Sequence, residues 1–241
     1  KKVLIALEKL LKTPTIAVIL EPLVQGAGGM RMVRPEFLIE VEKKIRQANS
    51  LLITDEVLTG FGRCGEFFAF QRAGLKPDLI SLSKGLTGGF LPMGITMASK
   101  SIHEGFLGED PQQTFWHGHS FTANPLGCAA ANASLDLLEK SPEKFLNFES
   151  RHLPHLEQIA TDPKVNYPRL TGTIAAFNIK VEGRKGYLSS VGKILKSAAL
   201  KAGVFIRPLG DVVYLMPPLC ITDEELEKCY FGIQEGLNSL S

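Results

Sequence analysis

Three short apolar runs in the first part of the chain each stop at a polar residue, and segments with helical spacing lie between them. The runs cover 16–20, 51–54 and 79–83, and they end at Glu21, Asp55 and Lys84. Continuous apolar runs that alternate with helices are typical of strands covered on both faces of a parallel sheet. The sequence therefore predicts an α/β fold with a mostly parallel sheet.

The pattern changes after a long helical segment that begins at Asn124 and ends at the Ser141–Pro142 break. Beyond it, helices mix with strands of antiparallel type at 174–181, 204–206 and 212–216. A capping box formed by Thr222 and Glu225 opens a last helix, expected over 223–237. We therefore expect residues 1–140 to form part of one domain and residues 141–241 to form a smaller α+β domain.

Composition limits the kinds of binding partner and the cellular compartment that we expect. A net charge of +2, without a long run of Lys or Arg, favours small-molecule partners over nucleic acid or a membrane surface. The four cysteines form no C-x-x-C pair, so we expect reduced thiols in a cytoplasm. The opening segment KKVLIALEKLLK predicts an amphipathic helix that Glu8 makes too polar for a membrane span. Because the chain starts with Lys inside this helix, we expect a missing N-terminal region.

Asp55 and Lys84 are the candidate reactive residues. Ligands of open α/β sheets bind beyond the carboxyl ends of the strands, so both side chains are expected in one crevice. In a mostly apolar cleft the ammonium form of a lysine is disfavoured, and its free amine attacks carbonyls to form an imine. Asp55 then pairs either with this lysine or with the ring nitrogen of a cofactor. The alternative is that Asp55 caps a turn and Lys84 is a solvated lysine, and spacing alone leaves both open.

Two other groups of residues do not indicate a functional site. His117 and His119 form an H-x-H pair, but no third ligand stands at a convincing spacing, so we expect no metal. Glu56 follows Asp55 directly, and adjacent strand residues point to opposite faces, which excludes a paired-carboxylate site. His103, His152 and His155 are expected at the surface.

Four ordered segments resemble the class III (fold type I) aminotransferases, which use pyridoxal phosphate. They read EPLVQGAGG, LLITDEVLTGFGRCGEFFAF, PDLISLSKGLTGGFLPMG and HGHSFTANPLGCAAANASL. The resemblance is strong over residues 16–140 and looser beyond. It implies that residues 1–140 are the C-terminal part of the cofactor-binding large domain.

The resemblance also implies residue roles. Lys84 would carry the cofactor as an imine and act as general base, Asp55 would pair with the pyridinium nitrogen, and Val57 would pack on the ring. The 117–120 segment would reach the neighbouring subunit's site, where His119 and the Ser120 hydroxyl contact the cofactor phosphate and Gly118 contacts substrate. A homodimer with cofactor sites at its interface follows from this resemblance.

Within the family, EPLVQGAGGMRM and IRPLGDVVYLMPPL look most like the branch that aminates 8-amino-7-oxononanoate in biotin synthesis. Ornithine and GABA enzymes read QGEAG, where this chain has Ala27, and carry an arginine where it has Tyr214. In the biotin branch Arg207 would bind the substrate carboxylate in a bidentate fork, with Tyr214 lining the same pocket. S-adenosylmethionine is the expected donor, and lysine, used by a variant of the same synthase, is the alternative.

Two further alternatives remain open from the sequence. The chain is another class III ω-aminotransferase, or it is an inactive fragment that lacks N-terminal residues contacting the phosphate and the substrate.

Overall fold

The computed structural model describes residues 2–183 and 186–240. The chain divides into two compact units. Unit 1 comprises residues 1–23, 33–61 and 67–141, and unit 2 comprises 24–32, 62–66 and 142–241. Two short segments of the first half thus group with the second unit, and the expected boundary between residues 140 and 141 stays a prediction.

Unit 1 is built on a four-stranded sheet in the order β1-β4-β5-β6. These strands are β1 (Ala17–Leu20), β4 (Leu51–Asp55), β5 (Leu79–Leu82) and β6 (Ile95–Ala98). β1, β4 and β5 are parallel, whereas β6 pairs antiparallel with β5. The predicted α/β fold with its mostly parallel sheet is therefore confirmed.

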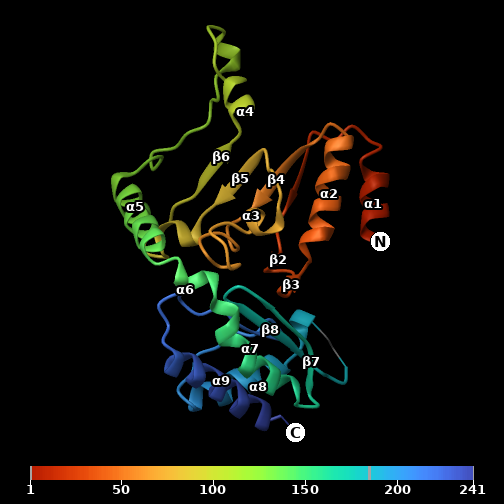
Figure 1. Ribbon diagram of the computed structural model, residues 1–241, viewed down its shortest axis with the longest axis vertical. Coiled ribbons are helices and arrows are strands. Elements are labelled where there is room, and N and C mark those ends of the chain that lie inside the picture. The colour runs from red at the N-terminus through yellow and green to blue at the C-terminus, as the bar shows by residue number, and fades with distance from the viewer. Residues whose placement is uncertain (1, 184–185, 241) are drawn as a thin grey trace. The chain divides into compact units, whose positions relative to one another are not determined.

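Helices flank this sheet (Figure 1). α1 (Lys2–Leu10) lies beside α2 (Pro35–Gln47), whose buried face is Leu38, Val41 and Ile45. Pro35 is the first residue of α2, where its missing N–H costs nothing. The remaining helices of unit 1 are α3 (Ala69–Ala73), the 3-10 turn η1 (Lys84–Thr87), α4 (Lys100–Glu104), the 3-10 turn η2 (Pro111–Gln113) and α5 (Pro125–Lys140). α5 packs on η1, and the Asn124 side chain caps it by accepting a hydrogen bond from Gly127 N at 2.7 Å.

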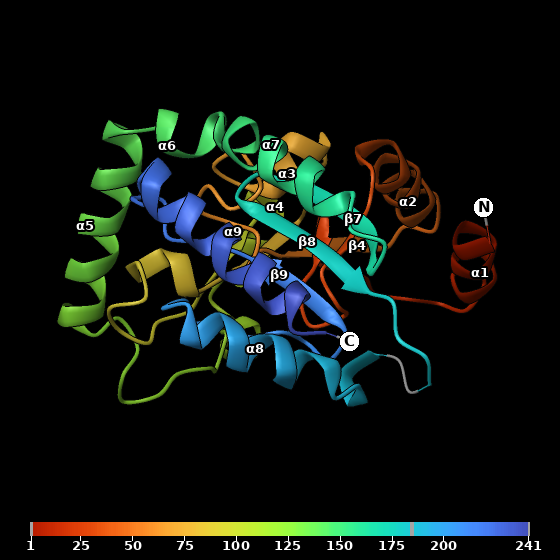
Figure 2. The ribbon, with the colours of Figure 1, turned by 90° about the horizontal axis from the view of Figure 1, so that it is seen from below.

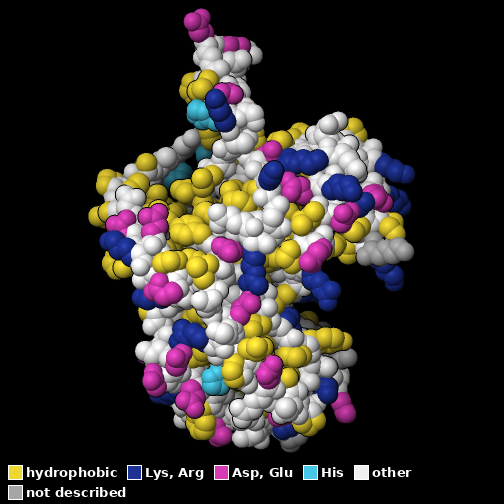
Figure 3. All heavy atoms as spheres, in the orientation of Figure 1, with side chains coloured by type: hydrophobic (Ala, Val, Ile, Leu, Met, Phe, Trp, Pro, Cys, Tyr) yellow, Lys and Arg dark blue, Asp and Glu magenta, His cyan; other side chains and the backbone are white. Residues whose placement is uncertain are grey.

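The segment between β6 and α5 extends beyond the sheet of unit 1 as an arm that includes α4 (Figures 1 and 3). Its aromatic side chains lie largely in solvent, as shown by the exposed fractions of Phe115 (63%), Trp116 (80%) and Phe121 (76%). We call residues 99–124 the arm.

Unit 2 centres on an antiparallel sheet in the order β7-β8-β9, with β7 (Val165–Thr171), β8 (Ile174–Ile179) and β9 (Val212–Leu215). It also contains the small ladder β2 (Val24–Gln25) with β3 (Arg31–Met32) and the helices α6 (Glu143–Leu146), α7 (Phe148–Ala160), η3 (Gly186–Leu188), α8 (Val191–Lys201) and α9 (Asp223–Asn238). α8 and α9 run side by side (Figure 2). The capping box of α9 is confirmed, since Thr222 accepts from Glu225 N and Glu225 accepts from Thr222 N.

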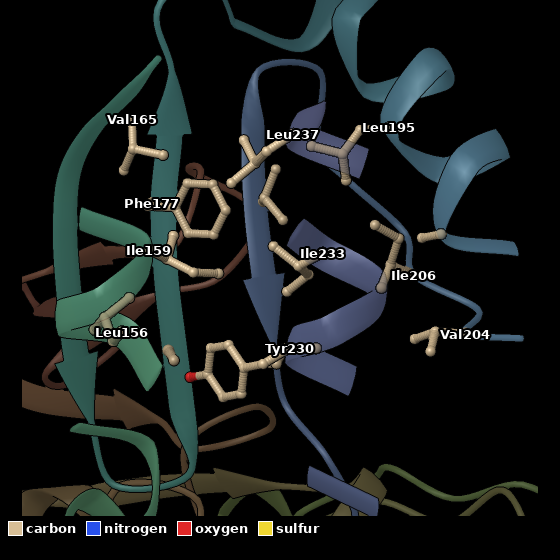
Figure 4. Packing of buried hydrophobic residues seen from close by; sticks show 14 of the residues in the cluster. Leu156, Ile159, Val165, Phe177, Leu195, Val204, Ile206, Tyr230, Ile233 and Leu237 are labelled. Carbon is tan, nitrogen blue, oxygen red and sulfur yellow. The ribbon is translucent and has the colours of Figure 1, made fainter. Parts of the chain in front are cut away.

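The core of unit 2 lies between this sheet and its helices (Figure 4). Phe177 of β8, Leu195 of α8 and Leu237 of α9 are at most 2% exposed. Burying such side chains contributes roughly 1.5–3 kcal/mol each. None of the helices in the described part of the chain is long and apolar enough to span a membrane.

One predicted strand is wrong. Residues 204–206 form no strand, because Val204 N bonds to Ala199 O at the end of α8 instead of to a sheet. Val204 and Ile206 are nevertheless buried, so their apolar pattern reflects packing rather than pairing.

Candidate functional site

Two of the expected site residues lie at the same edge of the unit 1 sheet. Asp55 is the last residue of β4 and pairs in register with Ser81 of β5, and Lys84 lies two residues beyond the end of β5. Because the two strands are parallel neighbours, their carboxyl ends bring Asp55 and Lys84 to one edge. Glu21 follows β1, which pairs with β4, and so lies at this edge as well.

The Asp55 carboxylate is half-buried and only partly satisfied. Its Oδ1 accepts a hydrogen bond from Val57 N at 3.0 Å. No hydrogen-bond partner for Oδ2 is found among residues 2–183 and 186–240. Val57 is also half-buried, so its side chain stays accessible beside this carboxylate. The pair offers one free acceptor atom next to an apolar surface.

Lys84 begins η1 in an unusual backbone conformation. Its φ is +46°, in the left-handed region that residues with a side chain rarely adopt. The Ser83 hydroxyl donates to Met93 O at 2.7 Å, and Gly89 N donates to Lys84 O at 3.2 Å. We expected a mostly apolar cleft around this lysine, whereas its side chain is exposed to solvent in this structure. The described residues therefore supply the position of the amine but not its enclosure.

Three further expected residues, Gly118, His119 and Ser120, lie on the arm and are exposed. Thr122 Oγ1 accepts a hydrogen bond from His119 N at 3.1 Å, and His119 Nδ1 accepts one from Phe121 N at 3.2 Å. These bonds shape a turn in which His119 and Ser120 are exposed. No group of three or more potential metal ligands occurs among the described residues.

Arg207 and Tyr214 belong to unit 2. Arg207 is exposed in the loop that follows α8, and Tyr214 is a half-buried residue of β9 that pairs with Ala176. Burial raises the pKa of the Tyr214 hydroxyl, and the nearby charge of Arg207 opposes that rise. The charge of Arg207 is therefore part of the electrostatic environment of Tyr214.

The prediction that His152 lies at the surface is wrong. His152 is fully buried, its Nδ1 lies 2.7 Å from the Tyr230 hydroxyl, and its Nε2 lies 3.1 Å from Thr173 O. Desolvation lowers its pKa to about 4. Helical spacing could have revealed it, because His152 stands four residues from both Phe148 and Leu156 on the buried face of α7. His155 is half-buried against Tyr230, and His103 is exposed as expected.

Sequence comparisons identify relatives of this chain. The aminotransferase class-III family matches residues 1–237. "Adenosylmethionine-8-amino-7-oxononanoate aminotransferase" of Synechococcus elongatus is 56% identical over 224 residues, which cover 93% of this chain and 53% of that protein. The protein of the same name from Geobacter sulfurreducens is 41% identical, over 92% of this chain and 51% of its own length. The chain thus spans about half the length of these relatives.

Solved structures agree with this result. The omega transaminase of Pseudomonas jessenii in complex with PMP superposes with a TM-score of 0.89 at 26% identity, covering 98% of this chain and 55% of that one. A Bacillus anthracis aminotransferase superposes with a TM-score of 0.88 at 24% identity, covering 98% of this chain and 56% of that one, and supports the fold alone. The chain belongs to the class III aminotransferases, a family that depends on pyridoxal phosphate.

Proposed function

We propose that the protein containing this chain transfers an amino group to 8-amino-7-oxononanoate, giving 7,8-diaminononanoate for biotin synthesis, with S-adenosylmethionine as donor. The observation that carries the proposal is the pair formed by Asp55 and Lys84 at the carboxyl ends of adjacent parallel strands. The names of the relatives at 56% and 41% identity support the substrate.

The residues at this edge fit pyridoxal phosphate. Lys84 provides a primary amine for covalent attachment through its Nζ. Asp55 Oδ2 has no hydrogen-bond partner among the described residues and can accept from a protonated ring nitrogen, and Val57 provides an apolar surface for the ring. When bound, the cofactor supplies the electron sink for the reaction. The chain contributes attachment, orientation and charge.

Lys84 would have a second role in the reaction, as a base. Its Nζ would take a proton from the substrate carbon that bears the amino group. Asp55 would accept the hydrogen bond of the protonated ring nitrogen. These roles need both residues at one edge, as the parallel strands provide.

We also propose that the functional unit is a homodimer in which the arm reaches the partner's site. His119 Nε2 and the Ser120 hydroxyl would donate to the cofactor phosphate there, and Gly118 would leave room for substrate. The exposure of the aromatic side chains on the arm supports this, since large apolar groups in solvent are typical of interaction surfaces.

In unit 2, Arg207 would bind the carboxylate of the amino-oxo acid, and Tyr214 would line the same pocket. The effect of the Arg207 charge on the pKa of the Tyr214 hydroxyl supports this assignment. We further propose that residues 1–140 are the C-terminal part of the cofactor-binding large domain and residues 141–241 the small domain. Four free cysteines are consistent with a cytoplasmic location.

The proposed reaction is tested by supplying 8-amino-7-oxononanoate with either S-adenosylmethionine or lysine and measuring diaminononanoate. Product with S-adenosylmethionine supports the proposal, and product with lysine alone changes the donor. No product with either donor, but turnover of other ω-amines, favours a general ω-aminotransferase. Because the chain spans half of its relatives, the assay includes both the 241-residue chain and the whole gene product. Activity only in the latter identifies the chain alone as an inactive fragment.

A further inference from the structure

Glu56, next to Asp55, is a fully buried carboxylate with no place in the reaction described above. It accepts three hydrogen bonds, from Thr59 Oγ1 at 2.6 Å, Ala69 N at 3.0 Å and Phe70 N at 2.7 Å. Burial raises its pKa, and these donors oppose the rise by stabilising the ionised form. Its backbone N–H also bonds to Ser81 O of β5 at 2.9 Å. Glu56 therefore fastens the end of β4 to β5 and to the start of α3.

The segment fastened in this way carries Phe61 against the residue that follows Lys84. Phe61 is 4% exposed and packs edge-on against Phe67 and Phe68, with ring centroids 6.0 and 5.5 Å away. A Cβ added to Gly85 would lie 2.8 Å from Phe61 Cβ, a distance too short for any side chain there. The aromatic residue is thus in direct contact with the backbone of Gly85.

Lys84 needs such support, because its φ of +46° is unfavourable for a residue with a side chain. Backbone conformations of this kind persist only where the surroundings fix them. Phe61 fixes Gly85 from one side, and the Ser134 hydroxyl of α5 donates to Gly85 O at 3.0 Å. Of these two contacts, the one with Phe61 connects Gly85 to the segment that Glu56 holds in place.

We propose that Glu56 is a positioning residue that acts through Phe61 and Gly85 to hold the Lys84 backbone in its left-handed conformation. The amine of Lys84 is thereby kept at the edge of the sheet where β4 ends with Asp55. This inference rests on the proposed function, in which Lys84 binds the cofactor. A carboxylate is required because both of its oxygens accept hydrogen bonds, whereas an amide at this position presents N–H groups to other N–H donors.

The test compares Glu56→Gln with Glu42→Gln. Glu42 is a suitable control because it is a carboxylate of the same unit that also accepts from a backbone N–H, that of Lys76 at 3.3 Å, but it serves α2. Amide hydrogen exchange is measured on the cofactor-free protein by mass spectrometry. We expect exchange at 57–61 and at 84–89 to accelerate roughly tenfold or more in Glu56→Gln and to stay unchanged in Glu42→Gln.

A second readout follows the pH titration of the cofactor's absorbance band in the loaded protein. The midpoint is expected to shift in Glu56→Gln and to match wild type in Glu42→Gln, since only the first variant moves the amine that bears the cofactor. If Glu56→Gln does not fold, Phe61→Leu keeps most of the apolar volume and should accelerate exchange at 84–89 alone.

The proposed function and the positioning role of Glu56 are refuted by different results. If the wild-type protein shows no absorbance band of the bound cofactor, the proposed function is wrong, while the exchange data still report on the link from Glu56 to Lys84. A wild-type band together with unaltered exchange at 84–89 and an unaltered midpoint in Glu56→Gln overturns the positioning role. Faster exchange at 57–61 without any at 84–89 overturns it as well.

Discussion

Replacing His152 by glutamine should remove a specific loss of stability in acid. Nε2 of His152 faces a carbonyl, Thr173 O, which can only accept, so the neutral ring donates from Nε2 and accepts the Tyr230 hydroxyl proton at Nδ1. A second proton on the ring would displace that hydroxyl hydrogen and place a charge in the core. The folded state therefore binds the proton more weakly than the unfolded chain, as the lowered pKa of about 4 indicates.

The sign and size of the effect follow from this difference. Between pH 6.5 and pH 4 the unfolded state binds more protons than the folded state, so stability falls as the pH falls through this window. Starting from pH 7.5, a single histidine with these two pKa values contributes a loss of about 2 kcal/mol at pH 5 and about 3 kcal/mol at pH 4. Above pH 7.5 the contribution has no further pH dependence.

The assay is urea unfolding followed by circular dichroism at several pH values for wild type and His152→Gln. The difference in unfolding free energy between the two proteins is the informative quantity, because titration of the other groups cancels. It should change by about 2 kcal/mol from pH 7.5 to pH 5. His103→Gln, on the exposed arm, serves as the control and should follow wild type. If the difference in unfolding free energy between wild type and His152→Gln is the same at pH 7.5 and at pH 5, the proposed effect of His152 is refuted.

Two other substitutions have defined outcomes. Arg207→Ala should raise KM for the amino-oxo acid at least tenfold with a smaller change in kcat, because an interaction with the unreacting carboxylate is lost. Arg207→Lys should recover part of the lost affinity. An unchanged KM in steady-state assays would show that Arg207 has only a structural role. Thr222→Ala should lower the unfolding free energy by about 1 kcal/mol through loss of the α9 cap, measured by urea unfolding. Thr222→Ser keeps the acceptor oxygen and should cost little, and equal losses in both variants would speak against the cap.

β4, which ends at Asp55, and β5, which precedes Lys84, could be predicted because strands covered on both faces of a parallel sheet have continuous apolar runs. β7 could not, since Pro168 lies within it and proline argues against a central strand. The structure accommodates this proline because β7 is an edge strand with a shift in register between Asn166 and Arg169.

Other features depend on contacts between distant residues. The left-handed conformation of Lys84 is fixed partly by the contact between Phe61 and Gly85, and no local pattern announces it. The buried environment of Glu56 likewise arises from α3, thirteen and fourteen residues further along the chain. The spacing argued against a paired-carboxylate site at Asp55 and Glu56, but no sequence pattern indicates the groups that Glu56 contacts.

The attachment point of the cofactor is the claim on which the account depends. The gene product is incubated with pyridoxal phosphate, reduced with borohydride, digested and mapped by mass spectrometry, with Lys84→Arg treated in parallel. The account predicts a single reduced cofactor adduct on Lys84 that is lost in Lys84→Arg. An adduct on a different side chain, or none in the wild-type protein, would contradict it.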